Sequence, residues 1–383
     1  MRIYLDNAAT TALHPEVIEA MTKVMQEQYG NPSSIHADGR AMRAIIEEAR
    51  KKVAKLIGAS IGEIFFTSGG TESNNMAIKC AVRDLGVRRI ISSPTEHHCV
   101  LHSLESVEHQ GVVIEMLRVD ERGHIDYDQL EELLQNDLGT KTLVSLMHAN
   151  NEIGTVSDME RISRLCENYG ALYHSDTVQT MGRFPFNVSK TRIHFLSGGG
   201  HKFHGPKGAG FIYINNKAHI KPFIDGGGQE RNMRGGTENV YGIAGLAKAL
   251  ELACENMAEY RQHIEEVRSY FKEKLAESFE DIQFNGDYDG DYLYTVLSVS
   301  FPYSPKSELL LLHLDIAGIS ASGGSACSSG AEAGSHVLAA LGADSKRKTI
   351  RFSFSHFNTK EEIDVVVQKM QGILPQVKSM AEA

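Results

Sequence analysis

A lysine lies in a glycine-rich turn, Gly198-Gly199-Gly200-His201-Lys202, between two apolar segments at 193–196 and 211–214. Both segments are typical of buried strands. A lysine held away from water has a lowered pKa and becomes an amine nucleophile, which can form a Schiff base with an aldehyde. Lysines beside glycines are also common in solvated loops, so the rest of the chain must decide between these interpretations.

Polar residues stand at the ends of three other strand-like segments. They are His97 after 89–93, Asn151 after 142–148 and Asp176 after 171–175. Alternating strands and helices predict an α/β fold with a mainly parallel sheet flanked by helices, in which ligands bind at the carboxyl ends of the strands. We therefore expect these three residues and Lys202 to face one pocket.

This set of residues meets the needs of one cofactor, pyridoxal 5'-phosphate. Lys202 would bond the aldehyde of this cofactor, and a carboxylate such as Asp176 would pair with its ring nitrogen. A flat side chain such as His97 would stack on its ring. Its phosphate needs the free N–H groups of a helix start, and the glycine turn at 68–71 precedes a predicted helix. Asp176 could instead be a turn residue and His97 an ordinary loop histidine, and both alternatives stay open here.

The length and pattern of the chain predict two domains. The chain has 383 residues, which is longer than a domain with a single hydrophobic core usually is. Its hydrophobic content of 42% is enough to fill two cores. One long helix, predicted over 239–278, would connect the two parts. We expect a large cofactor-binding domain over 14–255 and a smaller α+β domain made of 1–13 plus 256–383.

Composition argues against several classes of protein. The net charge is −10 and no long block of Lys and Arg occurs, so we expect no direct nucleic-acid partner. The five cysteines are scattered without a C-x-x-C pair, which argues against a disulfide framework or a zinc site. Apolar runs are too short to cross a bilayer and the first residues lack a secretory pattern, so we expect a cytoplasmic protein that does not bind a membrane.

One cysteine, Cys327, lies in a stretch of small residues from Ala321 to Gly334. This composition favours a mobile loop with a partly exposed thiol, whereas a core cysteine would have bulky apolar neighbours. Cys327 is therefore the candidate for a free, reactive thiol.

Seven motifs follow one another along nearly the whole chain. They are Asp6-Asn-Ala-Ala-Thr-Thr, Asn31-Pro-Ser-Ser-x-His36, Phe66-Thr-Ser-Gly-Gly-Thr-Glu-Ser-Asn-Asn75, Thr95-Glu-His97, His148-Ala-Asn-Asn-Glu-Ile-Gly154, His201-Lys202 and Gly323-Gly-Ser-Ala-Cys327. Together they resemble the cysteine desulfurases of the NifS/IscS type, which are class V aminotransferase-family enzymes of fold-type I. Some of these motifs occur in related enzymes, but their combination with Ser-Ala-Cys near the C-terminus is specific.

The resemblance implies a role for each candidate residue. Lys202 would bond the cofactor aldehyde, Asp176 the ring nitrogen, and His97 would stack on the ring and move protons. The further implied contacts are Gln179 with the ring hydroxyl, Gly70, Thr71 and His201 with the phosphate, Thr237 with the phosphate of the neighbouring subunit, and Asn151 and Arg351 with the substrate carboxylate. Cys327 would attack the sulfur of L-cysteine, which leaves a persulfide on Cys327 and L-alanine as product.

The resemblance also implies partners. The position of Thr237 implies an obligate homodimer, and the persulfide implies a sulfur-acceptor protein, either an iron–sulfur scaffold or a tRNA-thiolation enzyme. The spacing from Ser325 to His336 is that of the long-loop, IscS-like branch, with the short-loop branch as the alternative. An aminotransferase, a selenocysteine lyase and a sulfur carrier without turnover remain as other hypotheses. No metal site is expected.

Gly199 is one of the departures from the family pattern. Where the family usually reads Ser-Gly-His-Lys, this chain has Gly199-Gly200-His201-Lys202, so a glycine replaces the serine. A hydroxyl that the family directs at the phosphate is therefore missing.

Overall fold

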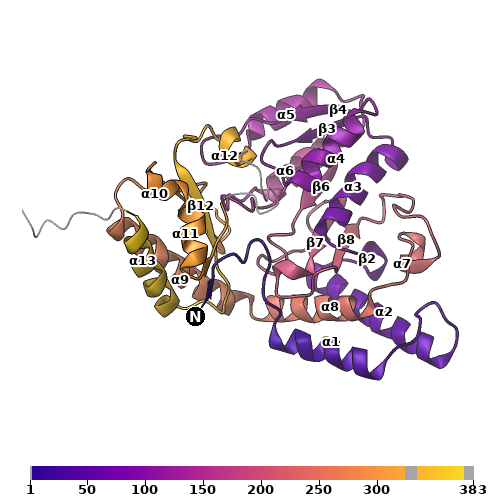
Figure 1. Cartoon of the computed structure of the whole chain (residues 1–383). Helices are drawn as coiled ribbons and strands as arrows, with labels where there is room; N and C mark the ends of the chain where they lie inside the picture. Colours follow the sequence, from indigo (N-terminus) through magenta and orange to yellow (C-terminus); the bar gives the residue numbers. More distant parts are fainter. Residues whose placement is uncertain (1, 324–333, 375–383) are drawn as a thin grey trace, which may run out of the picture.

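The larger part of the chain is built around one seven-stranded sheet (Figure 1). The computed structural model describes residues 2–323 and 334–374, so Cys327 lies outside the described residues. The strands are β2 (Ile64–Thr67), β3 (Arg89–Ser92), β4 (Val113–Met116), β5 (Thr142–Ser145), β6 (Leu172–Asp176), β7 (Phe195–Gly199) and β8 (Gly210–Ile214), in the spatial order β2-β8-β7-β6-β5-β3-β4. Neighbours from β4 to β7 are parallel, and β8 is antiparallel to β7 and β2. The prediction of a mainly parallel sheet is confirmed.

Helices cover both faces of this sheet because its strands are apolar on both sides. The helices are α1 (Pro15–Glu27), α2 (Ala37–Ile57), α3 (Gly70–Leu85), α4 (His98–Glu108), α5 (Tyr127–Asn136), α6 (Met159–Asn168), the short α7 (Gln229–Asn232) and α8 (Val240–Glu255). Successive side chains of a strand point to opposite faces. Phe65 accordingly packs in the core with α3 and α4, and Phe66 in the core with α2, α6 and α8.

A smaller body with its own core lies beside the first, and the N-terminal segment packs against it (Figure 1). Its antiparallel sheet has the order β12-β10-β9, and β1 pairs with β11 in parallel. The elements are β1 (Ile3–Tyr4), α9 (Met257–Ser278), β9 (Gln283–Asn285), β10 (Val296–Phe301), α10 (Pro305–Glu308), α11 (Leu310–Ile316), β11 (Ile319–Ser320), α12 (His336–Ala340), β12 (Lys348–Ser353) and α13 (Lys360–Ile373). We propose the domain boundaries 14–255 and 1–13 plus 256–383, which the separate cores support.

The connector predicted as one helix over 239–278 is wrong in one respect, because the structure has two helices there. Helix α8 ends at Glu255, and α9 begins at Met257. Between them Asn256 has φ −102° and ψ 13°, and its side-chain amide donates to the Leu252 carbonyl at 2.9 Å. Asparagine competes in this way for backbone groups and so favours a helix end. Among the described helices, none has the length and apolar character needed to cross a membrane.

A buried ion pair fixes the segment that leads from α7 to Thr237. Glu230 accepts two hydrogen bonds from the Arg50 guanidinium, at 2.7 and 3.0 Å, and one from the Phe66 N–H at 2.8 Å. Glu230→Ala would leave the buried Arg50 with only the half-exposed Glu47 as a carboxylate partner, so we expect the free energy of unfolding to fall by about 3 kcal/mol. Urea denaturation followed by circular dichroism measures this loss.

Glu48→Ala is the matched control, because Glu48 lies on the same helix as Arg50 and pairs with Lys51 at the exposed surface. Exposed pairs contribute only about 0–1 kcal/mol. A loss of similar size in the Glu48 and Glu230 variants would contradict the importance given to the buried pair.

Candidate active site

One cavity of about 220 Å³ opens at the carboxyl ends of β3, β5, β6 and β7. In chain order its lining residues are Ala8, Ala9, Gly70, Thr71, Asn74, His97, Cys99, Met147, Ala149, Asn151, Asp176, Val178, Gln179, His201, Lys202 and Arg351. The sequence-predicted cofactor and substrate residues are thus brought together, with two exceptions. Thr237 is exposed and does not line this cavity, and Cys327 lies outside the described residues.

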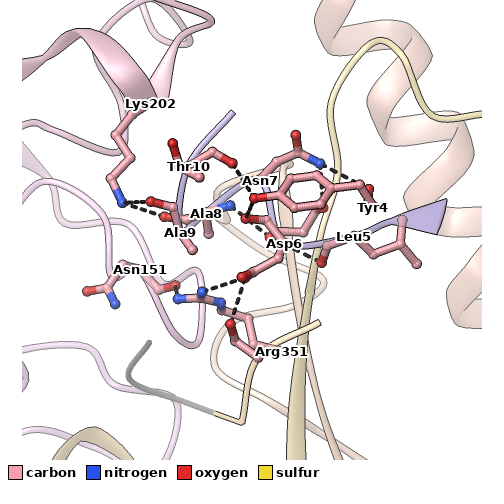
Figure 2. Close-up of polar contacts among 12 residues, drawn as sticks. Tyr4, Leu5, Asp6, Asn7, Ala8, Ala9, Thr10, Asn151, Lys202 and Arg351 are labelled. Atoms are coloured by element: carbon pink, nitrogen blue, oxygen red, sulfur yellow. Dashed lines mark hydrogen bonds and ion pairs between the residues drawn. The ribbon is translucent and has the colours of Figure 1, made fainter. Parts of the chain in front are cut away.

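Lys202 reaches the cavity from a short 3₁₀ turn, Gly200–Lys202, directly after β7. Its Nζ donates to the carbonyl oxygens of Ala8, at 2.6 Å, and Ala9, at 2.9 Å (Figure 2). The Arg183 guanidinium donates to the Lys202 carbonyl at 2.6 Å, which fixes the turn from behind. The amine is therefore held inside the cavity by the N-terminal segment.

Asp176 ends β6 with its carboxylate almost completely buried. It accepts hydrogen bonds from the Asn74 side-chain amide at 2.7 Å and from the Val178 N–H at 2.9 Å. The Asn74 carbonyl oxygen in turn accepts from His174 Nε2 at 3.1 Å and from the Ser197 hydroxyl. Burial lowers the pKa of His174 to about 3, so the His174 ring is neutral. Because the Asn74 side-chain oxygen accepts from His174 and Ser197, the Asn74 NH₂ group points toward Asp176.

Asn74 was not predicted as a site residue, although it stands in one of the quoted motifs. Its position one turn after Gly70 in α3 puts both residues on the same helix face. The spacing between Gly70 and Asn74 was the signal that could have identified Asn74 as a site residue. The carboxylate that Asn74 contacts, however, is far away in the sequence.

His97 precedes α4, and its ring Nδ1 accepts from the Cys99 N–H at 3.1 Å. The proton of the neutral ring therefore lies on Nε2. Burial lowers the pKa of His97, opposed by Asp176 and reinforced by Lys202, so the ring is neutral near pH 7. Any proton that His97 moves must pass through Nε2.

Cys99 places a thiol in the cavity lining, which the sequence did not single out. Its Sγ lies 3.0 Å from His97 Nδ1 and accepts from the Asn74 amide at 3.2 Å. Burial, with Asp176 nearby, raises the pKa of this thiol to about 12. The Cys99 thiol therefore stays protonated at neutral pH, whereas the thiolate is the nucleophilic form.

The start of α3 forms one end of the cavity. Gly69, with φ 155°, precedes the helix, and the first-turn N–H groups of Gly70 and Thr71 have no partner within the helix. His201 lines the same cavity, and burial lowers the pKa of its ring to about 4. The free N–H groups at the start of α3 and the neutral His201 ring can donate hydrogen bonds to an anion at this end of the cavity.

Arg351, from β12, lies at another part of the lining and is 2% exposed. Its guanidinium donates to the main-chain carbonyl of Asn151 at 2.9 Å and to the Asp6 carboxylate at 3.0 Å (Figure 2). Asp6 belongs to the same N-terminal segment whose carbonyls hold Lys202. Gln179 also contacts this segment, because its side-chain amide donates to the Ala8 carbonyl at 2.9 Å.

Known proteins resemble the chain over nearly its full length. The family described as Aminotransferase class-V matches residues 3–366. The cysteine desulfurase IscS of Dictyoglomus turgidum is 43% identical over 383 residues, which cover 99% of this chain and 96% of that protein. The cysteine desulfurase IscS of Methanosarcina thermophila is 41% identical, covering 99% and 93%.

Solved structures also resemble the chain over nearly its full length. A structure titled NifS-like protein superimposes with a TM-score of 0.89 at 39% identity and covers 97% of this chain and 99% of its own. A structure titled SspA in complex with cysteine superimposes with a TM-score of 0.79 at 30% identity, covering 94% and 100%.

Proposed function

Because the chain belongs to the aminotransferase class-V family and is a cysteine desulfurase, we propose that it uses pyridoxal 5'-phosphate to convert L-cysteine to L-alanine. The sulfur passes first to Cys327, as a persulfide, and then to an acceptor protein. The observation that carries this proposal is the meeting of Lys202, Asp176 and His97 around one cavity that also contains Arg351.

The donor set of the cavity fits the cofactor. An amine for the aldehyde is supplied by Lys202, a buried carboxylate for the ring nitrogen by Asp176, and a neutral imidazole for the ring face by His97. The remaining proposed contacts are Gln179 with the ring hydroxyl and Gly70, Thr71 and His201 with the phosphate. When bound, pyridoxal phosphate supplies an electron sink that stabilises negative charge on the amino acid.

Asp176 has a defined task in this arrangement. A carboxylate that keeps its negative charge holds a proton on the ring nitrogen through a charge-assisted hydrogen bond. The Asn74 amide and the Val178 N–H both donate to Asp176. These two donors therefore fix the direction of the carboxylate.

Two groups of the cavity can hold or move a proton at the substrate. They are Lys202 Nζ and His97 Nε2. The lowered pKa of His97 keeps the ring neutral, and a neutral ring can accept a proton only at its unprotonated nitrogen. Since the Cys99 N–H occupies Nδ1, the neutral His97 ring donates from Nε2, and Lys202 Nζ is the group placed to accept a proton from the substrate.

The substrate carboxylate would bind Arg351 and Asn151. A buried arginine offers two parallel N–H donors to a carboxylate, which orients the amino acid as well as binding it. The Cys327 thiolate then attacks the substrate sulfur. The S–S bond forms as the substrate C–S bond breaks, the electron pair stays with the substrate carbon, and protonation of that carbon yields L-alanine.

The proposed partners follow from the same chemistry. We propose a homodimer in which Thr237, exposed on its own subunit, reaches the phosphate of its neighbour. The persulfide is delivered to an iron–sulfur scaffold or a tRNA-thiolation enzyme. The IscS names of the relatives favour the first of these acceptors.

The test is to mix the purified enzyme with L-cysteine and follow L-alanine and protein-bound persulfide together. Alanine in step with a persulfide that peptide mapping assigns to Cys327 supports the proposal. A bound cofactor without alanine would refute it, and selenocysteine and amino-acid transamination would be tested next.

The glycine that replaces the usual serine allows a gain-of-function prediction. A Cβ on Gly199 would lie 3.5 Å from Val178, 3.6 Å from the Gly70 nitrogen and 3.8 Å from the His201 ring, which are ordinary contact distances. Gly199→Ser therefore adds a hydroxyl beside the proposed phosphate site without a clash. We expect the cofactor to bind about tenfold tighter, as one added hydrogen bond to a charged group provides. Fluorescence titration of the cofactor-free protein measures this affinity.

Gly198→Ser is the matched control one residue earlier. There a Cβ would lie 2.4 Å from the Phe211 ring, so this variant should lose stability and gain no affinity. Unchanged or weaker cofactor binding in a folded Gly199→Ser variant would contradict the proposed phosphate site.

A further inference from the structure

The buried arginine of the cavity already has an anionic partner. Asp6 Oδ1 lies 3.0 Å from Arg351 Nη2, and Figure 2 shows the carboxylate between the guanidinium and the N-terminal strand. The Arg351 side chain is 2% exposed and that of Asp6 is 18% exposed. Asp6 therefore neutralises, from inside the protein, the charge that the substrate carboxylate is proposed to bind.

The arginine has unused donor capacity beside this pair. Arg351 Nε is buried and has no hydrogen-bond partner among the residues that the structure describes. Nη1 donates to the Asn151 carbonyl, so only Nη2 carries a charged partner. A carboxylate that binds Nε and Nη2 side by side would satisfy the first and compete with Asp6 for the second.

Both carboxylates cannot remain on Arg351 at low cost. One guanidinium neutralises one carboxylate, and two carboxylates that share a buried site repel each other. Arg351 itself cannot be left alone, because a buried charge without a partner is strongly destabilising. Binding of an amino acid is therefore an exchange of one anion for another.

Asp6 is the partner that can leave. The same oxygen, Oδ1, accepts a hydrogen bond from the Ser322 hydroxyl at 2.7 Å, and part of the side chain reaches solvent. After the exchange, Asp6 keeps this hydroxyl and gains water. Ser322 thus lowers the cost of releasing Arg351.

We propose that Asp6 is a positioning residue that stands in for the substrate carboxylate on Arg351 and gives way when L-cysteine binds. It keeps the arginine neutralised and oriented in the free enzyme, and it returns to help expel the carboxylate of L-alanine. This inference rests on the proposed role of Arg351 in binding the substrate.

The test measures the affinity of the cofactor-loaded enzyme for L-alanine by isothermal titration calorimetry, since alanine carries the carboxylate and has no thiol to react. Asp6→Asn removes the competing charge, so alanine should bind roughly tenfold tighter. Ser322→Ala removes a hydroxyl whose hydrogen bond to Asp6 is stronger once the carboxylate no longer pairs with Arg351, so alanine should bind several-fold more weakly. A purely structural role of Asp6 would weaken binding instead.

Thermal unfolding gives a second readout. The Asp6→Asn variant should unfold at a lower temperature than the wild type without amino acid, and added L-alanine should raise that temperature by more than in the wild type. Equal or weaker alanine binding in Asp6→Asn would overturn the exchange. If that variant does not fold, unchanged binding in Ser322→Ala would overturn it.

Arg351→Ala separates this inference from the proposed function. It should weaken alanine binding by roughly 100-fold. If it does so while Asp6→Asn gains nothing, the exchange is wrong and the substrate role of Arg351 stands. If Arg351→Ala binds alanine normally, the substrate role and the exchange are both wrong.

Discussion

The Lys202→Ala variant is expected to lose the visible absorption band of the lysine-bound cofactor and to form L-alanine slower by roughly four orders of magnitude. Lys202 is the lysine of the described cavity lining, and its amine is held there by two backbone carbonyls. Alanine at this position removes both the covalent attachment and a proton-carrying group. The absorption spectrum and alanine formation, measured on the same preparation, test the two losses.

Lys207→Ala is the matched control, because Lys207 is an exposed lysine in the same glycine-rich segment. It should keep the absorption band and the rate. A Lys202→Ala protein that keeps an unchanged band would disprove the assignment of the cofactor lysine.

The second large effect is expected at Cys327. Cys327→Ser should still bind the cofactor and L-cysteine, yet form no protein persulfide and release no sulfide, since a hydroxyl cannot replace the attacking thiolate. Persulfide labelling followed by peptide mass spectrometry measures this, with the wild type beside it.

Two other thiols serve as comparisons. Cys254→Ser should leave persulfide formation unchanged, since Cys254 is a half-buried helix residue away from the cavity lining. Cys99→Ser tests the thiol inside the cavity, whose pKa of about 12 keeps it protonated. Persulfide should still form on residue 327 in that variant. Sulfide release at the normal rate from Cys327→Ser would mean that the nucleophile is another residue.

The sequence predicted the sheet and the helices around it because their apolar patterns are local. It also predicted that His97, Asn151, Asp176 and Lys202 would lie together, since parallel strands bring their carboxyl ends to one edge. These four residues do line one cavity, whereas their individual roles remain proposals.

Other features of the site depend on contacts that no local pattern encodes. Asn74 contacts Asp176, 102 positions away, and Asp6 contacts Arg351, 345 positions away. The break at Asn256 depended on one side chain competing for a backbone carbonyl. The proposed contribution of Thr237 depends on a second subunit, so one chain alone does not reveal it.

The burial of the other thiols has a practical consequence for labelling. Burial raises the pKa of Cys80 and of Cys254 to about 11, raises that of Cys166 still further, and raises that of Cys99 to about 12. At neutral pH an alkylating dye reacts with thiolates and so discriminates against all four. A fluorophore added to the unmodified enzyme should therefore attach at Cys327. Its emission would report the arrival of an acceptor protein at this thiol, the proposed sulfur donor, without any cysteine having to be removed.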